Sequence, residues 1–555
     1  MKRAEALVSR RLEHRSPYLW ELAGVGGLLA LLYALWFTVA SPVGEFPIND
    51  DWAYAFSVRH LLETGQLKLS QWTSSSIIFQ VFLGSAVAWA SGGFTFTALR
   101  LTTLAVSFLG GLAAYDLFRQ LRLPSSAALL GTLVIVANPI FMYLSYTFMA
   151  DIYFLTMMFV SVSLYTRGVT TGSRRMLLAG SVAAALAYLS RQLGMFLPPA
   201  AAIALVLKQR RLPWPALWAI GLIPAVVMIT HAIWLWFVHW VPWALQARAI
   251  DQSFAKLLKP GAALTLLQHA LVTLLYLGMF TLPALAARFA RSGQPREQRI
   301  HLSVAFGVWL VILAVFVYAA RVGMPHLPGT IKANGLGLIP LDKPQITPGW
   351  VFWLATIVAP VAGALQGALW TDAVATAWRD RAGPGVTLIV ASVLMAAMTG
   401  IAVILWDKYL LVFIPAALYL ALRPGPINVR QWMVALPILA AVVIYGTLEM
   451  GDHMAWNAAR WSAGQKLVAR GLRPELIDAG FEWTGWYEFE DKAPKAIAAG
   501  QTSISYWPSF TAKKTHVLRF TGLADYMIVG EERYRTPVLG RRGRILVLFR
   551  ETPLP

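Results

Sequence analysis

The sequence contains no cysteine and few charged residues. Of its 555 residues, 13% are charged and 57% are hydrophobic. A soluble domain carries about 25% charged residues, so this balance predicts a protein that crosses a membrane many times. The absence of cysteine excludes disulfides, thiolate metal sites and a thiol nucleophile.

Acids are the scarcer charged class: 27 Asp and Glu stand against 47 Lys and Arg, which gives a net charge of +20. Such an excess can indicate nucleic-acid binding, but here the basic residues form no single patch. They stand in short loops between apolar runs, as at 174–175 and 208–211. Cytoplasmic loops that face anionic headgroups have this distribution, so we expect membrane lipids as partners and no nucleic acid.

Apolar runs recur up to about residue 448. About twenty apolar residues cross a bilayer, and Lys and Arg in the short loops set the orientation. These rules predict a polytopic all-α membrane region, 1–448, with about thirteen transmembrane helices and a cytoplasmic N-terminus. The basic N-terminus precedes a run without a cleavage site, which we interpret as a retained first span. The predicted spans are 19–40, 98–118, 127–146, 151–165, 176–189, 193–207, 217–238, 264–287, 302–320, 351–370, 386–406, 409–422 and 433–448.

The segment between the first two predicted spans is long and only partly apolar. Residues 51–64 are predicted to form an amphipathic helix on the membrane surface, with Asp50 or Asn49 supplying the N-cap oxygen and Gly65 at its end. The run 77–90 is short for a span, and a span there would place the basic loop 119–122 outside. We therefore treat it as a second surface helix or a re-entrant helix.

The chain changes character at about residue 449, where charged and polar residues become frequent. A helix at 456–470, ended by Gly471, precedes apolar runs of strand length. We expect 449–555 to form a small C-terminal α/β domain outside the membrane. In the membrane region, the outer loop 321–348 is rich in Gly and Pro, which predicts an ordered loop or a mobile lid.

Two adjacent acids, Asp50 and Asp51, follow the first predicted span. They stand in the run FPINDDWAY, residues 46–54. An N-cap beside a solvated acid would explain a lone Asp, but aromatic rings beside two acids suit sugar binding. Sugar transfer needs a base near the acceptor and surroundings that tolerate oxocarbenium character. A carboxylate at the membrane face can provide both.

This run, together with the LETG that ends the predicted surface helix, resembles the first outer loop of the C-type superfamily of polyprenyl-phosphate-sugar-dependent glycosyltransferases. Related members are the dolichyl-phosphate-mannose protein mannosyltransferases and the bacterial aminoarabinose transferases that act on lipid A. The resemblance covers most of 1–449. It implies the C-type glycosyltransferase fold with an outer C-terminal domain, and a place in a bacterial inner membrane. In that family an Asp-Glu pair occupies this position, and its first acid is the base. Asp50 inherits that role, and Asp51 is a second catalytic candidate.

Asp151 opens the predicted span 151–165. An acid at the end of a hydrophobic helix is unfavourable unless it meets water or a polar cavity. A water-exposed N-cap is one interpretation. The family resemblance implies a second acid in this loop that shapes the active site, and on that basis Asp151 is a third catalytic candidate.

Arg191 and Gln192 lie at the outer end of a predicted span, against the positive-inside distribution. Arg191 can extend to lipid headgroups, or it can bind the phosphate of the lipid carrier at two points. Lys408 and Tyr409, in WDKYLL, resemble the charged-Tyr-Leu-Leu signature that opens a late span in the family. A cation there would stabilise the departing phosphate, whereas an interfacial ion pair with Asp407 is an equal alternative.

Four residues of the predicted surface helix are candidate substrate contacts or, equally, surface residues: Trp52, Tyr54, Arg59 and His60. The tail segment DAGFEWTGW, 478–486, has acids and tryptophans that could bind a sugar, but a packing strand is the preferred interpretation.

These residues predict an inverting glycosyltransferase with a polyprenyl-phosphate sugar as donor and a lipid, glycan or protein as acceptor. No glycine-rich phosphate loop follows a strand, which argues against nucleotide-sugar chemistry. The alternatives are a flippase or transporter, which would favour mid-bilayer charges and two matching halves, and a ligase or polymerase using lipid diphosphate donors. We expect a monomer. No cofactor is assigned with certainty, no metal ligands are assigned, and a divalent metal is left open.

Overall fold

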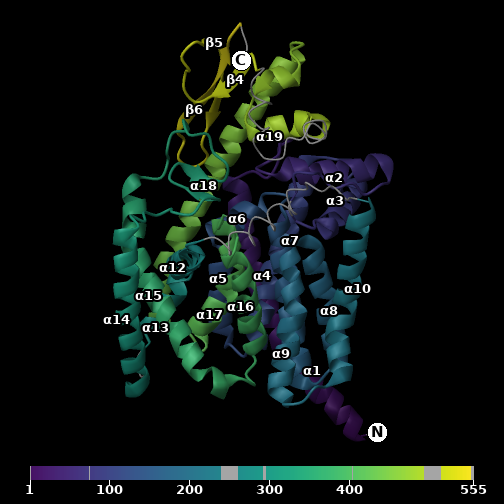
Figure 1. Cartoon of the computed structure of the whole chain (residues 1–555), viewed down its shortest axis with the longest axis vertical. Helices are drawn as coiled ribbons and strands as arrows, with labels where there is room; N and C mark the ends of the chain where they lie inside the picture. The colour runs from purple at the N-terminus through teal and green to yellow at the C-terminus, as the bar shows by residue number, and fades with distance from the viewer. Residues whose placement is uncertain are drawn as a thin grey trace.

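The computed structural model describes residues 2–73, 75–238, 260–291, 295–402, 404–492 and 514–551. Its main body is a bundle of helices, and a smaller part with a β-sheet stands on one end, here called the cap end (Figure 1). The elements of the bundle and its surface are α1 (Lys2–Val39), α2 (Asp51–Thr64), α3 (Ile78–Ala90), α4 (Phe96–Gln120), α5 (Ser125–Val136), α6 (Pro139–Ser145), α7 (Ala150–Thr171), α8 (Arg174–Ser190), η1 (Gln192–Phe196), α9 (Leu197–Gln209), α10 (Trp214–Val238), α12 (Ala262–Phe280), α13 (Leu282–Phe289), α14 (Arg296–Ala319), α15 (Gly349–Asp380), α16 (Val386–Gly400), η2 (Asp407–Phe413), α17 (Ile414–Leu422) and α18 (Val429–Ala469).

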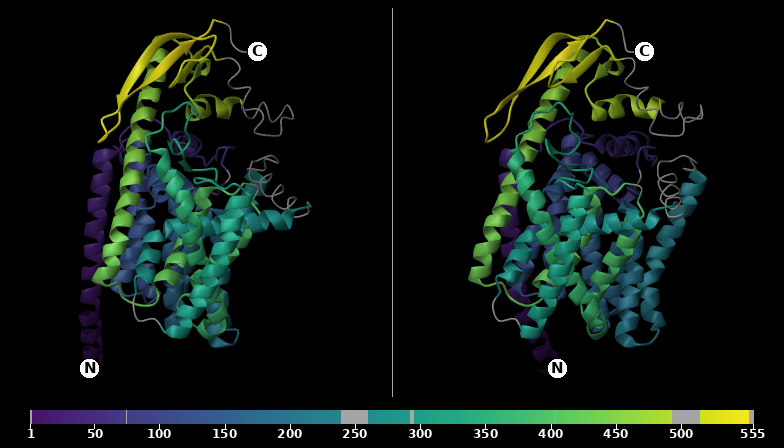
Figure 2. Two further views of the ribbon diagram at one scale, coloured as in Figure 1. Left: turned by 90° about the vertical axis from the view of Figure 1, so that its left-hand side faces the viewer. Right: turned by 60° about the vertical axis from the view of Figure 1, so that its left-hand side comes forward.

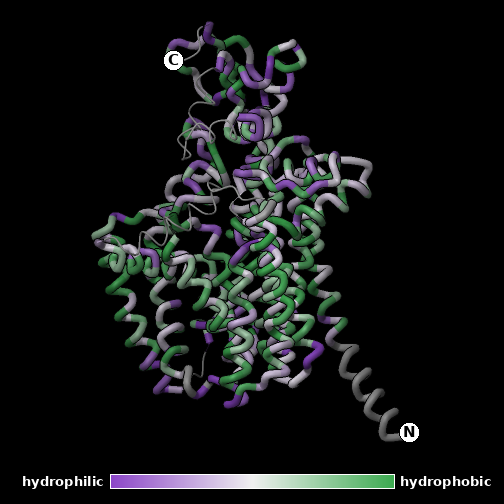
Figure 3. The backbone as a smooth tube through the Cα atoms, turned by 45° about the vertical axis from the view of Figure 1, so that its right-hand side comes forward, coloured by the Kyte–Doolittle hydropathy of each residue, from purple (hydrophilic) through white to green (hydrophobic). Residues whose placement is uncertain are grey.

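Among the described residues, eight helices are long and apolar enough to cross a membrane, and α5 with α6, bent by 63°, makes a ninth if the pair is one span. Hydrophobic residues run along the bundle, and hydrophilic ones gather at its ends and in the cap (Figure 3). The predicted polytopic all-α membrane architecture is therefore confirmed, while the count of thirteen stays a prediction. Some predicted spans are broken near proline, as where η2 meets α17 at Ile414-Pro415, because proline lacks the N–H that continues a helix.

The two helices α2 and α3 lie across the cap end of the bundle (Figure 1 and Figure 2). α2 has the predicted bounds, and Gly65 follows it in the left-handed conformation at φ 71°. The capping prediction for Asp50 is wrong in one respect. Asp50 occupies the N-cap position, but its side chain makes no capping hydrogen bond. That carboxylate is engaged elsewhere, as described below.

The cap is joined to the bundle through one helix. The predicted break between a last span and a helix at 456–470 is wrong, because α18 runs for 41 residues without interruption. At 1.5 Å per residue it is about 60 Å long, twice the hydrocarbon thickness of a bilayer, so its second half extends into the cap (Figure 2). The expected domain boundary at 449 therefore falls inside a helix.

The predicted small C-terminal α/β region is confirmed. Its four-stranded sheet has the order β3-β4-β6-β5, with β3 parallel to β4 and the other pairs antiparallel. The segment 478–486, preferred above as a packing strand, is helical for most of its length. The cap elements are η3 (Pro474–Leu476), β3 (Ile477–Asp478), α19 (Phe481–Thr484), η4 (Gly485–Phe489), β4 (His516–Arg519), β5 (Met527–Arg535) and β6 (Arg542–Phe549).

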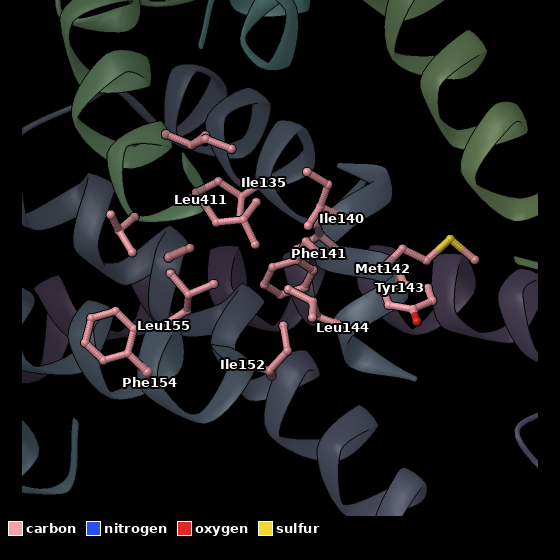
Figure 4. Packing of buried hydrophobic residues seen from close by; sticks show 14 of the residues in the cluster. Ile135, Ile140, Phe141, Met142, Tyr143, Leu144, Ile152, Phe154, Leu155 and Leu411 are labelled. Carbon is pink, nitrogen blue, oxygen red and sulfur yellow. The ribbon is translucent and has the colours of Figure 1, made fainter. Parts of the chain in front are cut away.

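A buried apolar cluster fixes the elements beneath the cap end. All seven residues of α6 are buried, and they pack with side chains of α5, α7 and η2 (Figure 4). Phe141, Ile152 and Leu411 are among the residues in this cluster. Full burial of such a side chain contributes about 1.5–3 kcal/mol. The first turn of α7 and the start of η2 are thus held against one rigid core.

The outer loop 321–348 is ordered and contains a hairpin of β1 (Ile331–Lys332) and β2 (Gly335–Leu336). Asp407 holds it, because its carboxylate accepts hydrogen bonds from the backbone N–H of Thr330 at 2.8 Å and of Ile331 at 2.7 Å. Glycine is required at 329, where φ is 138° and an added Cβ would lie 2.0 Å from Asp407 Oδ1.

The same loop ties the cap to the bundle. Asp342 Oδ2 accepts the backbone N–H of Phe520 at 2.9 Å, and Lys343 forms a buried ion pair of 2.6 Å with Asp452 of α18. The loop therefore contacts the cap on one side and the start of η2 on the other.

Candidate active site

The two adjacent acids have different surroundings. Asp51 is buried, with 2% of its surface exposed, whereas Asp50 at the preceding position is partly exposed. Burial raises the pKa of both carboxyls above the usual range of an aspartate, and that of Asp51 to about 8. Of the pair, only Asp50 combines a raised pKa with an accessible carboxylate.

Both oxygens of Asp51 accept backbone hydrogen bonds. Oδ2 accepts from Ile48 N–H at 3.2 Å, and Oδ1 accepts from Phe148 N–H at 2.7 Å. Ile48 precedes the acidic pair, and Phe148 immediately precedes α7. The Asp51 side chain therefore joins the first outer loop to the segment that presents Asp151.

Asp50 has one oxygen engaged. Its Oδ1 accepts a hydrogen bond of 2.8 Å from Trp72 Nε1, and its Oδ2 takes no hydrogen bond from any described residue. Burial is the main cause of the raised pKa of Asp50, and the negative charges of Glu482 and Asp151 raise this pKa further. The positive charge of Lys408 and the hydrogen bond from Trp72 act in the opposite direction and lower it. Asp50 is thus electrostatically coupled to Lys408 and Asp151, which come from distant segments.

Asp151 in the first turn of α7 forms an ion pair with Arg191, the residue between α8 and η1. Their side chains are 6% and 14% exposed. The Arg191 guanidinium also lies 5.1 Å from the centre of the Tyr409 ring. The predicted site residues Asp151, Arg191 and Tyr409 are therefore brought together, although 218 positions separate Arg191 from Tyr409 in the sequence. Gln192 follows Arg191 as the first residue of η1.

Lys408 is the second residue of η2, directly after Asp407. The predicted alternative of an Asp407–Lys408 ion pair is not formed, because the Asp407 oxygens accept backbone N–H groups of the 321–348 loop. Within the described part of the chain, the Lys408 ammonium group has no hydrogen bond or ion pair, and the residue is partly exposed. It is a cation available at the site.

The surface-helix residues divide into two sets. Tyr54 is buried and belongs to the site, since burial and the carboxylates of Asp50 and Asp151 raise the pKa of its hydroxyl. Trp52 is fully buried, with its ring 5.0 Å from Phe489 and 5.8 Å from Trp72. The substrate contact predicted for Trp52 is therefore corrected to a packing contact between α2 and the cap.

Arg59 and His60 lie farther along α2. Arg59 is eight residues past Asp51, about 12 Å along the helix. It pairs with Glu63 at 3.0 Å and covers the Trp486 ring, and His60 stacks on Phe56. The structure does not bring them to the acids, and their contact with substrate stays a prediction.

Arg100 of α4 was missed by the sequence reasoning. It is fully buried and donates hydrogen bonds to the backbone carbonyls of Pro42 and Phe46 at 2.7 Å, and of Gly44 and Tyr146 at 3.1 Å. It therefore holds the loop that leads into the acidic pair. The signal was present, because an arginine within a predicted span indicates a buried polar partner.

Glu482 of α19 was considered for sugar binding, but it holds the acidic loop instead. Its Oε1 accepts the Asn49 N–H at 3.2 Å, and its Oε2 pairs with Arg460 of α18 at 2.7 Å. Asn49, directly before Asp50, is in the left-handed conformation at φ 57°. The cap thus contributes a residue that fixes the backbone beside Asp50.

Among the described residues, no group of three or more His, Asp or Glu side chains is placed to hold a metal ion. The gathered acids are instead paired with Arg191, with backbone N–H groups or with Trp72.

Comparison with known proteins gives one family match. Residues 82–234 match the family of dolichyl-phosphate-mannose-protein mannosyltransferases. No curated protein matches the sequence. Among solved structures, the chain is similar to ArnT from Cupriavidus metallidurans bound to undecaprenyl phosphate, with 14% identity and a TM-score of 0.40 over 94% of this chain and 97% of that one. It is also similar to the oligosaccharyltransferase AglB from Archaeoglobus fulgidus in complex with an inhibitory peptide and a dolichol-phosphate, with 14% identity and a TM-score of 0.42 over 91% of this chain and 69% of that one. The family match thus confirms the resemblance to the dolichyl-phosphate-mannose protein mannosyltransferases over 82–234, a segment that contains Asp151 and Arg191 but not the run 46–54.

Proposed function

We propose that the protein is a membrane glycosyltransferase that moves a monosaccharide from a polyprenyl-phosphate carrier to a lipid, glycan or protein acceptor, with inversion at the anomeric carbon. The observation that carries this proposal is the grouping of Asp50, Asp151, Arg191 and Lys408 at the cap end of an apolar bundle. The carboxylate of Asp50 is partly exposed there, and the positive charge of Lys408 acts on it.

In the proposed reaction, Asp50 accepts the proton of the acceptor hydroxyl or amine as that group attacks the anomeric carbon. The bond from the anomeric carbon to the phosphate oxygen breaks, and the electron pair leaves with polyprenyl phosphate. Lys408 and Arg191 stabilise the charge that develops on this phosphate, which needs charge stabilisation more than protonation. A raised pKa makes Asp50 a stronger base than an ordinary aspartate, which suits it to this transfer.

Asp51 has a positioning role in this scheme. It is 2% exposed, so an acceptor hydroxyl or amine does not reach its carboxylate, and each of its oxygens accepts one backbone N–H that holds the loop. Asp151 acts through Arg191, because the ion pair fixes the guanidinium beside Tyr409.

The proposal is tested by measuring which class of sugar donor the protein uses. Purified protein in proteoliposomes would be given a membrane extract as acceptor source and three donor classes: polyprenyl-phosphate sugars, polyprenyl-diphosphate sugars and nucleotide sugars. We expect release of polyprenyl phosphate with the first class and no transfer with the other two. Transfer from diphosphate or nucleotide donors, or none from any polyprenyl-phosphate sugar, would contradict the proposal.

Loss of the available cation should slow the reaction. Lys408→Met is expected to lower kcat by about a hundredfold, because removal of one group that stabilises transition-state charge has an effect of this order. Polyprenyl phosphate release under saturating donor measures it. Lys466→Met, which removes an exposed cap lysine paired with Glu532, is the matched control and should leave the rate unchanged. Equal rates for Lys408→Met and the control would exclude the role of Lys408.

The hydrogen bond from Trp72 should lower the pKa of Asp50, the proposed base. Trp72→Phe removes the N–H that favours the charged form of Asp50, so the pKa of Asp50 should rise further. A base is active when deprotonated, so activity is lost as pH falls through this pKa. The acid limb of the kcat/KM profile should therefore move to higher pH, by about one unit. A limb that stays in place or moves to lower pH would show that Asp50 is not the titrating base.

A further inference from the structure

A second charged cavity lies at the end of the bundle opposite the cap, on the predicted cytoplasmic side. It has a volume of about 840 Å³ and is bounded by the loops after α4, α13, α15 and α17 (Figure 1). Among the described residues, five arginines and one acid line it: Arg122, Arg288, Arg291, Arg381, Arg423 and Asp372. The acid is already engaged, since Asp372 pairs with Arg423 at 2.8 Å. The lining is therefore strongly cationic.

Arg288 is the most buried arginine of this lining, and one of its N–H groups lacks a hydrogen-bond partner in the described part of the chain. Its residue surface is 4% exposed, and its buried Nε has no hydrogen-bond partner among the described residues. It is repelled by Arg291 and Arg423, and Asp372 is the attractive charge that faces it. Asp372 is shared with Arg423, so it compensates the charge of Arg288 only in part, and a buried guanidinium that is not fully compensated is unfavourable. An anion in the cavity would relieve this, and a phosphate matches a guanidinium at two points.

Apart from Gln298 and the Tyr419 hydroxyl, the remaining lining is apolar, and part of it is exposed on the outside of the bundle. Val374 of α15 is 74% exposed and Val393 of α16 is 55% exposed, and both line the cavity. An ion in water would not need such walls. A phosphate that carries a hydrocarbon chain would place its charge among the arginines and its chain along the valines. Basic pockets between spanning helices on the cytoplasmic side bind anionic lipid headgroups in this way.

We propose that this cavity binds the phosphate headgroup of an anionic phospholipid, with Arg288 and Arg122 as its ligands. The site lies at the opposite end of α17 from Lys408, so it is distinct from the candidate active site. Binding there would set the position of the bundle in an acidic leaflet. It requires neither a sugar donor nor an acceptor.

Lipid-dependent melting of the full-length protein tests this proposal. Delipidated protein in detergent would be titrated with phosphatidylglycerol, phosphatidylcholine or inorganic phosphate, and its melting temperature would be followed. We expect saturable stabilisation by phosphatidylglycerol alone. Arg122→Gln changes an exposed side chain and should fold normally, and it should weaken the apparent affinity about fivefold. Arg288→Gln should weaken it at least as much.

Arg211→Gln is the matched control, because Arg211 is an exposed arginine on the same predicted face outside the cavity. Its affinity for phosphatidylglycerol should equal that of the parent protein. Equal stabilisation by phosphatidylcholine would overturn the proposal. So would equal weakening by Arg211→Gln, or an equal effect of inorganic phosphate, which would assign the cavity to a free anion.

Discussion

Asp50→Asn is expected to lower the turnover of polyprenyl-phosphate sugar by about 10²–10⁴-fold, the usual contribution of a general base. The amide has the shape of the carboxylate, and its oxygen can still accept the Trp72 N–H, so the loop should keep its conformation. What is lost is the ability to take a proton from the acceptor. Donor binding, measured by retention of labelled polyprenyl-phosphate sugar, should remain while release of polyprenyl phosphate falls.

The control for this variant is Glu63→Gln, an equally conservative change at the exposed end of the same helix, 13 positions farther along the chain. It should transfer sugar at the parental rate. If Asp50→Asn turned over as fast as Glu63→Gln at equal expression, Asp50 would not be the base.

Glu482→Ala should cause the largest loss of stability, about 3–5 kcal/mol, because it leaves Arg460 buried without its charged partner. The two side chains are 1% and 5% exposed and lie 2.7 Å apart. The variant also releases the Asn49 N–H beside Asp50, so residual folded protein should show a reduced kcat. Thermal melting in detergent and turnover per folded protein measure the two effects.

Two further variants test whether the loss of stability in Glu482→Ala comes from the broken ion pair with Arg460. Glu475→Ala removes a partly exposed acid of the same cap region and should change stability by less than about 0.5 kcal/mol. The double variant Arg460→Met/Glu482→Leu leaves no lone buried charge and should recover most of the lost stability. A double variant as unstable as Glu482→Ala would contradict this explanation.

Long apolar runs and loop charges were enough to predict the helical membrane region, because a span must satisfy its backbone within one helix. The amphipathic pattern and Gly65 likewise predicted the bounds of α2. The break before residue 456 was predicted wrongly. Polar residues after 448 indicate where the chain leaves the bilayer, but α18 continues through that point because nothing in its sequence ends the helix.

The charged residues of the site were predicted from the sequence, but the residues that hold them in place were not. Asp50, Asp151, Arg191 and Lys408 each stood out as a charge at the expected outer interface, and the structure brings their segments together. The roles of Asp51, Trp72 and Glu482 depend on contacts between segments 22 to 433 positions apart. No local pattern encodes which acid is held by backbone N–H groups and which stays partly exposed, so the two adjacent aspartates looked equivalent in sequence.

The most direct test of the proposed displacement is the anomeric configuration of the product. A polyprenyl-phosphate sugar of known configuration would be transferred to an acceptor from membrane extract, and the new linkage would be assigned by NMR. A single displacement with Asp50 as base predicts inversion. Retention would contradict the account, because it requires a second displacement and a nucleophile on the protein.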